Sequence, residues 1–102
     1  MHIIRTYQLS LEAEQDISDI FDFTEREFGF NQVVEYLSNL ERLFENLIVN
    51  PMLGRERKEI RADLFSLIYI SHIIFYRLVN DQIRVVRVLH VSRDLPRHLG
   101  PS

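Results

Sequence analysis

Apolar side chains recur every three or four residues from Leu11 to Phe28, which is the period of an amphipathic helix. Ser10 precedes this segment, where its hydroxyl can accept a hydrogen bond from a free amide of the first turn. Gly29 follows it and can adopt the left-handed conformation that often ends a helix. The pattern predicts a helix over residues 11–28. Its packed stripe is expected to consist of Ala13, Ile17, Ile20, Phe21, Thr24 and Phe28.

A second helical pattern covers residues 32–49, after a candidate capping residue at Asn31. Asn50-Pro51 ends it, because proline disfavours the helical conformation in the residue before it. Few residues separate the two predicted helices, so we expect an antiparallel hairpin whose apolar stripes share one cover. The second stripe is expected to consist of Val33, Leu37, Leu40, Phe44, Leu47 and Ile48.

The remaining apolar segments are short and dense in Ile, Leu, Val, Phe and Tyr, which favours strands. We predict strands at residues 2–8, 64–70, 72–79 and 82–90. Asn80-Asp81 is expected to be a turn, and residues 52–63 a loop or irregular strand.

Both faces of the last predicted strand carry apolar side chains, so we expect that strand inside the sheet. One face would hold Ile83, Val85, Arg87 and Leu89, and the other would hold Arg84, Val86, Val88 and His90.

These elements predict one α+β domain over residues 1–102, in the order β-α-α-β-β-β. A helical hairpin would pack on a small, mainly antiparallel sheet of three to four strands. The chain has 102 residues, of which 46% are hydrophobic, and this suits a single core.

Composition excludes several classes of site. The chain has no cysteine, so thiol chemistry, disulfides and zinc–thiolate sites are absent. No glycine-rich phosphate-binding motif occurs, and the four histidines show no metal-ligand spacing, so we expect neither a cofactor nor a metal. No apolar run is long enough to span a bilayer, and a cytoplasmic location is expected.

Charge is distributed unevenly along the chain. Residues 1–50 hold three basic and ten acidic residues, whereas residues 51–102 hold nine basic and five acidic ones. A positive face is therefore expected in the C-terminal half.

Several short motifs, taken in order, resemble ParE-type toxins of the RelE/ParE superfamily. The motifs are Ser10-Leu-Glu-Ala-Glu-Gln-Asp-Ile17, Phe28-Gly29, Asn50-Pro51-x-x-Gly54-Arg55, Glu59-Ile60-Arg61, Ser71-His-Ile-Ile-Phe-Tyr-Arg77, Ile83-x-Val-Val-Arg-Val-Leu-His90 and Asp94-x-x-Arg97-His98-Leu99. The resemblance implies a cytoplasmic toxin that binds DNA gyrase and is neutralised by a ParD-like antitoxin. It implies no catalytic residues, no membrane and no sequence-specific nucleic-acid binding by the toxin alone.

RelE-type relatives cut messenger RNA on the ribosome, and this enzymatic alternative would use Arg61, Arg77, Arg87 and His90. The segment after the last strand lacks the tyrosine that commonly completes such a site, and Lys58 is the only lysine. Arginine stays protonated near neutral pH, so His90 alone would have to transfer protons on both sides of the phosphate. A degenerate toxin that only binds its antitoxin is a further alternative.

Two sets of binding residues follow. Phe23 lies roughly 100° from the centre of the packed stripe of its helix, which leaves an aromatic side chain for a partner. With Ile20 and Val34 it is the predicted antitoxin contact. The predicted target contact is the polar end of the chain: Arg87, His90, Arg93, Asp94, Arg97 and His98.

Overall fold

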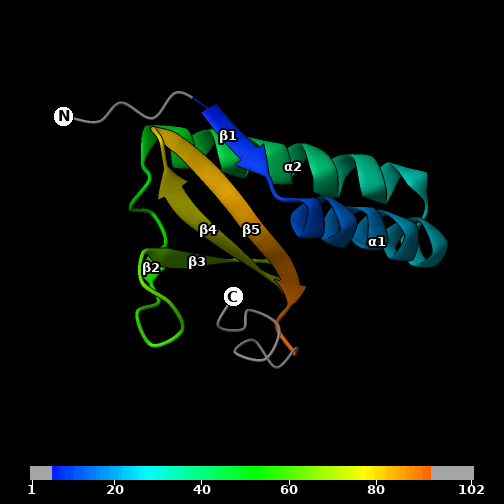
Figure 1. Cartoon of the computed structure of the whole chain (residues 1–102). Coiled ribbons are helices and arrows are strands. Elements are labelled where there is room, and N and C mark those ends of the chain that lie inside the picture. The colour runs from blue at the N-terminus through cyan, green and yellow to red at the C-terminus, as the bar shows by residue number, and fades with distance from the viewer. Residues whose placement is uncertain (1–5, 93–102) are drawn as a thin grey trace.

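Two helices lie against a five-stranded sheet in the computed structural model, which describes residues 6–92 (Figure 1). The elements are β1 (Thr6–Leu9), α1 (Leu11–Phe28), α2 (Phe30–Val49), β2 (Arg55–Glu56), β3 (Leu64–Tyr69), β4 (His72–Val79) and β5 (Gln82–His90). The predicted α+β class is confirmed. The sheet has five strands rather than three to four, because the stretch expected to be a loop or irregular strand supplies β2.

The helices begin and end where local capping chemistry allows. The hydroxyl of Ser10 accepts a hydrogen bond from the backbone N–H of Ala13 at 3.0 Å, and α1 ends at Phe28, as predicted. The predicted start of the second helix, at residue 32, was wrong. α2 begins at Phe30, and Asn31 lies inside the helix rather than capping it. Gly29 separates the two helices with φ 90°, a conformation that glycine adopts without steric cost, so the chain turns in one residue.

The strand order is β1-β5-β4-β3-β2. β1 is parallel to β5, and the other neighbours are antiparallel. The predicted first strand, residues 2–8, is observed as Thr6–Leu9, and residues 2–5 of that prediction lie outside the described part of the chain. β5 lies inside the sheet, as expected from its two apolar faces.

A bulge in β5 changes which side chains share a face. Tyr76 pairs with Val85 but Phe75 pairs with Arg87, so Val86 is an extra residue on β5. The prediction that Ile83, Val85, Arg87 and Leu89 share one face is therefore wrong. Beyond the bulge it is Val88 that joins Ile83 and Val85 in the main core, while Leu89 belongs to a separate cluster with Leu64, Ile73 and Phe75.

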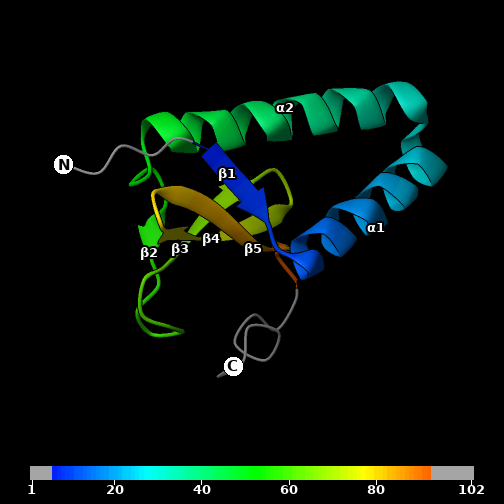
Figure 2. The same ribbon diagram turned by 45° about the horizontal axis from the view of Figure 1, so that its top comes forward.

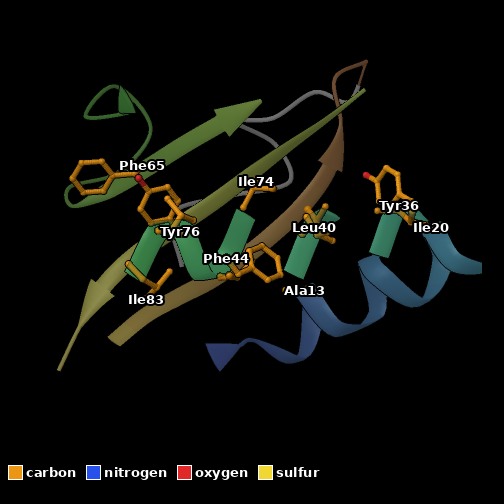
Figure 3. Packing of buried hydrophobic residues seen from close by; sticks show 12 residues of the cluster. Ala13, Ile20, Tyr36, Leu40, Phe44, Phe65, Ile74, Tyr76 and Ile83 are labelled. Carbon is orange, nitrogen blue, oxygen red and sulfur yellow. The ribbon is translucent and has the colours of Figure 1, made fainter. Parts of the chain in front are cut away.

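The main core lies between the helices and one face of the sheet (Figures 2 and 3). Leu40 and Phe44 of α2 pack over Ile74 and Tyr76 of β4, while Ala13 and Ile20 contribute from α1. The shared cover expected for the two helices is thus confirmed. Burial of this apolar surface is the main stabilising contribution to the fold.

One predicted member of the stripe on α1 is not packed. Phe28 is exposed, because the turn between the helices projects beyond the strands (Figure 2). Tyr36, which the second stripe omitted, is buried in the core.

Tyr76 also forms hydrogen bonds with the segment that follows α2. Its hydroxyl donates to the carbonyl of Pro51 at 2.8 Å and accepts from the backbone N–H of Gly54 at 2.9 Å. A Cβ at position 54 would lie 2.6 Å from that hydroxyl, so only glycine fits there.

Candidate functional site

An open groove of about 510 Å³ runs between the helical hairpin and the sheet. α1, the first turns of α2, the turn between β3 and β4, and the end of β5 form its walls. The residues that line it are Asp16, Asp19, Ile20, Phe23, Thr24, Phe28, Gln32, Tyr36, Ile70, Ser71, His72, Val88, Leu89 and His90. This groove joins elements that are distant in sequence, and most of its lining is apolar.

Three of the apolar side chains on the rim are exposed to solvent. Phe23 is 51% exposed, which confirms its predicted place off the packed stripe of α1, and Phe28 stands beside the turn between the helices. The guanidinium carbon of Arg26 lies 5.9 Å from the centre of the Phe23 ring, over its face. Ile70 is 69% exposed on the opposite rim. Exposed apolar side chains around a concavity are typical of partner-binding surfaces.

Ile70 has an unfavourable backbone conformation. It and Ser71 link the paired residues Tyr69 and His72, and its φ of 56° lies in the left-handed region. A β-branched residue is rare there, and a two-residue hairpin turn with positive φ at its first central position prefers glycine. Strain of this kind is found at binding sites, where the side chain is needed despite its cost.

Polar side chains also line the groove. The hydroxyl of Tyr36 and Nδ1 of His72 lie 2.8 Å apart, and the rings of His72 and His90 meet edge to face at 5.6 Å between centroids. Burial lowers the pKa of His72, with a further contribution from His90, and burial raises the pKa of Tyr36. Nδ1 of a neutral His72 can therefore accept a hydrogen bond that the hydroxyl of Tyr36 donates.

His90 is less enclosed. It is exposed at the end of β5, and its Nδ1 accepts a hydrogen bond from the backbone N–H of Ser92 at 3.1 Å. This is the local role of a polar strand terminus.

α1 caps the edge of β5 beside the groove. The Ser10 amide donates to Val85 O at 2.9 Å, and the Ser10 hydroxyl donates to Val86 O at 2.7 Å. Further along, Asp16 Oδ2 accepts from the backbone N–H of Val88 at 2.9 Å. These bonds continue the edge that β1 covers only as far as Val85.

Asp16 also holds Arg87 through two hydrogen bonds. Nε of Arg87 donates to Oδ2 at 2.8 Å, and Nη2 donates to Oδ1 at 2.9 Å. Hydrogen bonding to Asp16 raises the pKa of Arg87. Such a two-pronged ion pair fixes the orientation of both side chains, so Asp16 and Arg87 join α1 to β5.

The predicted binding residues are partly brought together. Ile20, Phe23 and His90 line the groove, whereas Val34 is exposed on α2 outside it. Arg93, Asp94, Arg97 and His98 lie outside the described residues. Sequence reasoning missed Tyr36, Ile70 and His72 as groove residues. The spacing of Tyr36 from Val33 and Leu40 signals a core position, but no local pattern indicates its contact with His72.

In the enzymatic alternative, His90 is separated from Arg77 along the sheet. Arg77 pairs with Arg84 near one end of the β4–β5 ladder, and His90 pairs with His72 at the other end. Arg87 is held by Asp16, and Arg61 lies in the segment before β3. Within residues 6–92 no three His, Asp or Glu side chains gather as metal ligands, and no helix there is long and apolar enough to cross a membrane.

Comparison with known proteins places this fold in context. Residues 7–95 match the family model described as the ParE toxin of the type II toxin–antitoxin system parDE. Toxin ParE1 of Caulobacter vibrioides is 32% identical over 97 residues, which cover 95% of this chain and 100% of that protein. Toxin ParE1 of Mycobacterium tuberculosis is 37% identical over 94 residues, which cover 91% and 96%.

A solved structure has the same fold. A chain of the chromosomal ParDE TA system from P. aeruginosa superposes with a TM-score of 0.75 at 15% identity. The match covers 90% of this chain and 100% of that one.

Proposed function

This chain belongs to the ParE toxin family of type II toxin–antitoxin systems, and on that basis we propose that it inhibits DNA gyrase by binding and is neutralised by a ParD-like antitoxin. The observation that carries the binding mode is the open groove with the exposed side chains of Phe23, Phe28 and Ile70 on its rim. Such a surface suits an apolar segment of a partner protein.

The antitoxin occupies the groove through Ile20 and Phe23, and it extends along α2 to Val34. The edge of the sheet offers the antitoxin a second contact. β2 pairs only with Phe65 and Ser66, so within residues 6–92 the outer edge of β3 has no strand partner from Leu67 to Tyr69, directly before Ile70 on the groove rim. A segment that leaves the groove at Ile70 can add to this edge as an extended strand.

Gyrase contacts the end of β5 and the polar residues after it. His90 is exposed and lines the groove, and Arg93, Asp94, Arg97 and His98 follow it in the sequence. Arg87 supports this contact from within β5. Its ion pair with Asp16 fixes the strand that leads into the segment.

The proposed mode is not catalytic. RNA cleavage needs a base, an acid and cations around one phosphate. Arg77 and His90 lie toward opposite ends of the β4–β5 ladder, and His90 is paired with Ser92. These positions support inhibition by binding over cleavage.

The deciding experiment adds purified protein to a gyrase supercoiling assay and to a translating extract in which messenger ends are mapped. We expect supercoiling to stop, the antitoxin to restore it, and no new messenger ends to form. New codon-specific ends that vanish with His90→Ala would favour the nuclease. Antitoxin binding with neither activity would indicate a degenerate toxin.

A further inference from the structure

Two arginines face each other across neighbouring strands on the sheet surface that the helices do not cover. Arg77 of β4 is paired directly with Arg84 of β5. Ile74 and Tyr76 of β4 belong to the core under the helices, so strand alternation directs Arg77 to the opposite face. Directly opposed side chains in a sheet are close neighbours, and like charges in such a pair repel each other.

The same row continues on both sides of the arginine pair. Leu64 of β3 is the other partner of Arg77, and Gln8 of β1 is the other partner of Arg84. Leu64 is buried with Ile73 and Phe75 in the small cluster on this face. The row therefore places two guanidinium groups and an amide on neighbouring strands, next to the buried side chain of Leu64.

The charge of this pair is not compensated within the described residues. Neither Arg77 nor Arg84 takes part in an ion pair there, although Arg57 and Arg87 do. Nε of Arg77 is buried and has no hydrogen-bond partner in that part of the chain. A buried donor without an acceptor is unfavourable, as is the facing charge.

We propose that Arg77 and Arg84, with Gln8 beside them, form a binding site for a carboxylate of an acidic peptide segment. A carboxylate can accept hydrogen bonds from both guanidinium groups, as Asp16 does from Arg87 in this same molecule. It would offset the repulsion between the two arginines.

The small number of cations in the row favours a protein segment over a nucleic acid. Binding to a phosphate backbone gains affinity from several cations along a stripe, whereas this row offers two. A single carboxylate is enough to match two guanidinium groups with an amide beside them.

The test uses the full chain labelled with ¹⁵N, with hexaglutamate and a thymidine hexanucleotide as probes at equal ionic strength. We expect hexaglutamate to shift the Nε–H resonance of Arg77, and Arg84→Gln to weaken that binding by about tenfold, the value of one charge-assisted hydrogen bond. Without peptide, Arg84→Gln should raise Tm, because the facing charge is gone.

Arg55→Gln is the matched control, because Arg55 is exposed, pairs with Glu59 at 3.6 Å and lies outside the row. It should bind hexaglutamate like the wild type. Equal affinity of Arg84→Gln and wild type, or a lower Tm for Arg84→Gln, would overturn the site. Tighter binding of the thymidine hexanucleotide would overturn the choice of an acidic peptide. None of these measurements uses gyrase or an antitoxin, so the result is separate from that for the proposed function.

Discussion

Single residues on the groove show where binding and stability conflict. Ile70 holds a left-handed conformation at the turn between β3 and β4 and presents its side chain to solvent. Asp16, by contrast, has an acidic side chain that is only 11% exposed and accepts three hydrogen bonds from β5.

Replacing Ile70 with glycine should stabilise the isolated protein by about 0.5–1 kcal/mol, because glycine enters the left-handed region without a Cβ clash. Denaturant unfolding measures this. Ile68→Gly is the matched control, since Ile68 is also 69% exposed but lies within β3 with no positive φ. It should destabilise the protein. Equal destabilisation by both substitutions would show that Ile70 is not strained.

Asp16→Ala should destabilise the fold by about 2 kcal/mol, because it leaves a guanidinium group and a backbone N–H without their acceptor. Asp19→Ala is the control: Asp19 is exposed and accepts a hydrogen bond from the exposed side chain of Gln15 on the same helix. Its effect on the free energy of unfolding should stay within about 0.5 kcal/mol. If the two substitutions were equivalent, Asp16 would have no role in holding α1 to β5.

At the level of elements, some residues of α1 hold the fold together and others line the groove. Its Ala13 and Ile20 pack in the core, and its Ser10 cap and Asp16 close the edge of β5. The side chain of Phe23 remains free of the core and faces the groove. A partner can therefore bind α1 without disturbing its packing.

Phe23→Ala should weaken the complex with the antitoxin by about 1–3 kcal/mol, the range for an aromatic anchor. Calorimetric titration measures the loss. Leu11→Ala is the control, because Leu11 is exposed on the same helix but does not line the groove. Unchanged affinity for Phe23→Ala would exclude it from the interface.

The contact between α2 and β4 through Tyr36 and His72 should make stability depend on pH. The pKa of His72 is lowered from 6.5 in the folded protein, so the unfolded chain binds the proton more readily. Stability should therefore fall as pH drops below 6.5 toward the lowered pKa, and level off below it.

His72→Gln removes this titration while leaving an acceptor for the hydroxyl of Tyr36. Its Tm should change less than that of the wild type between about pH 7 and 5, the range in which an ordinary histidine titrates. His90 and Asp16 also act electrostatically on His72, so the comparison is made within one buffer series. Parallel curves for the two proteins would contradict a role for His72.

At the scale of the whole molecule, acidic and basic residues are concentrated in different halves of the chain. α1 carries most of the acidic residues of the first half, while nine of the twelve basic residues lie in the second half of the sequence. The proposed antitoxin and target contacts meet at the groove, where Phe23 and His90 are both part of the lining.

Charge reversal at Arg93 and Arg97 should reduce gyrase inhibition while leaving Tm and antitoxin affinity nearly unchanged. Surface charge substitutions usually alter stability by less than about 0.5 kcal/mol. The supercoiling assay, run beside thermal unfolding, measures both effects. Inhibition that is lost only when the protein unfolds would refute a direct contact.

The sequence by itself determined the elements that depend on local signals. The Ser10 cap and Gly29 gave both ends of α1, and the Asn80-Asp81 turn, with positive φ at both residues, gave the β4–β5 hairpin. Periodicity also indicated that Phe23 lies off the packed stripe. These features depend on neighbours within a few residues, so their chemistry is readable in the chain.

Only the tertiary structure decided what distant segments do together. The parallel pairing of β1 with β5, the bulge at Val86 and the contact of Tyr36 with His72 have no local signature. The same holds for the ion pair of Asp16 with Arg87, 71 residues apart. Each depends on which apolar faces pack together and on which buried polar groups then find a partner, and packing settles both at once.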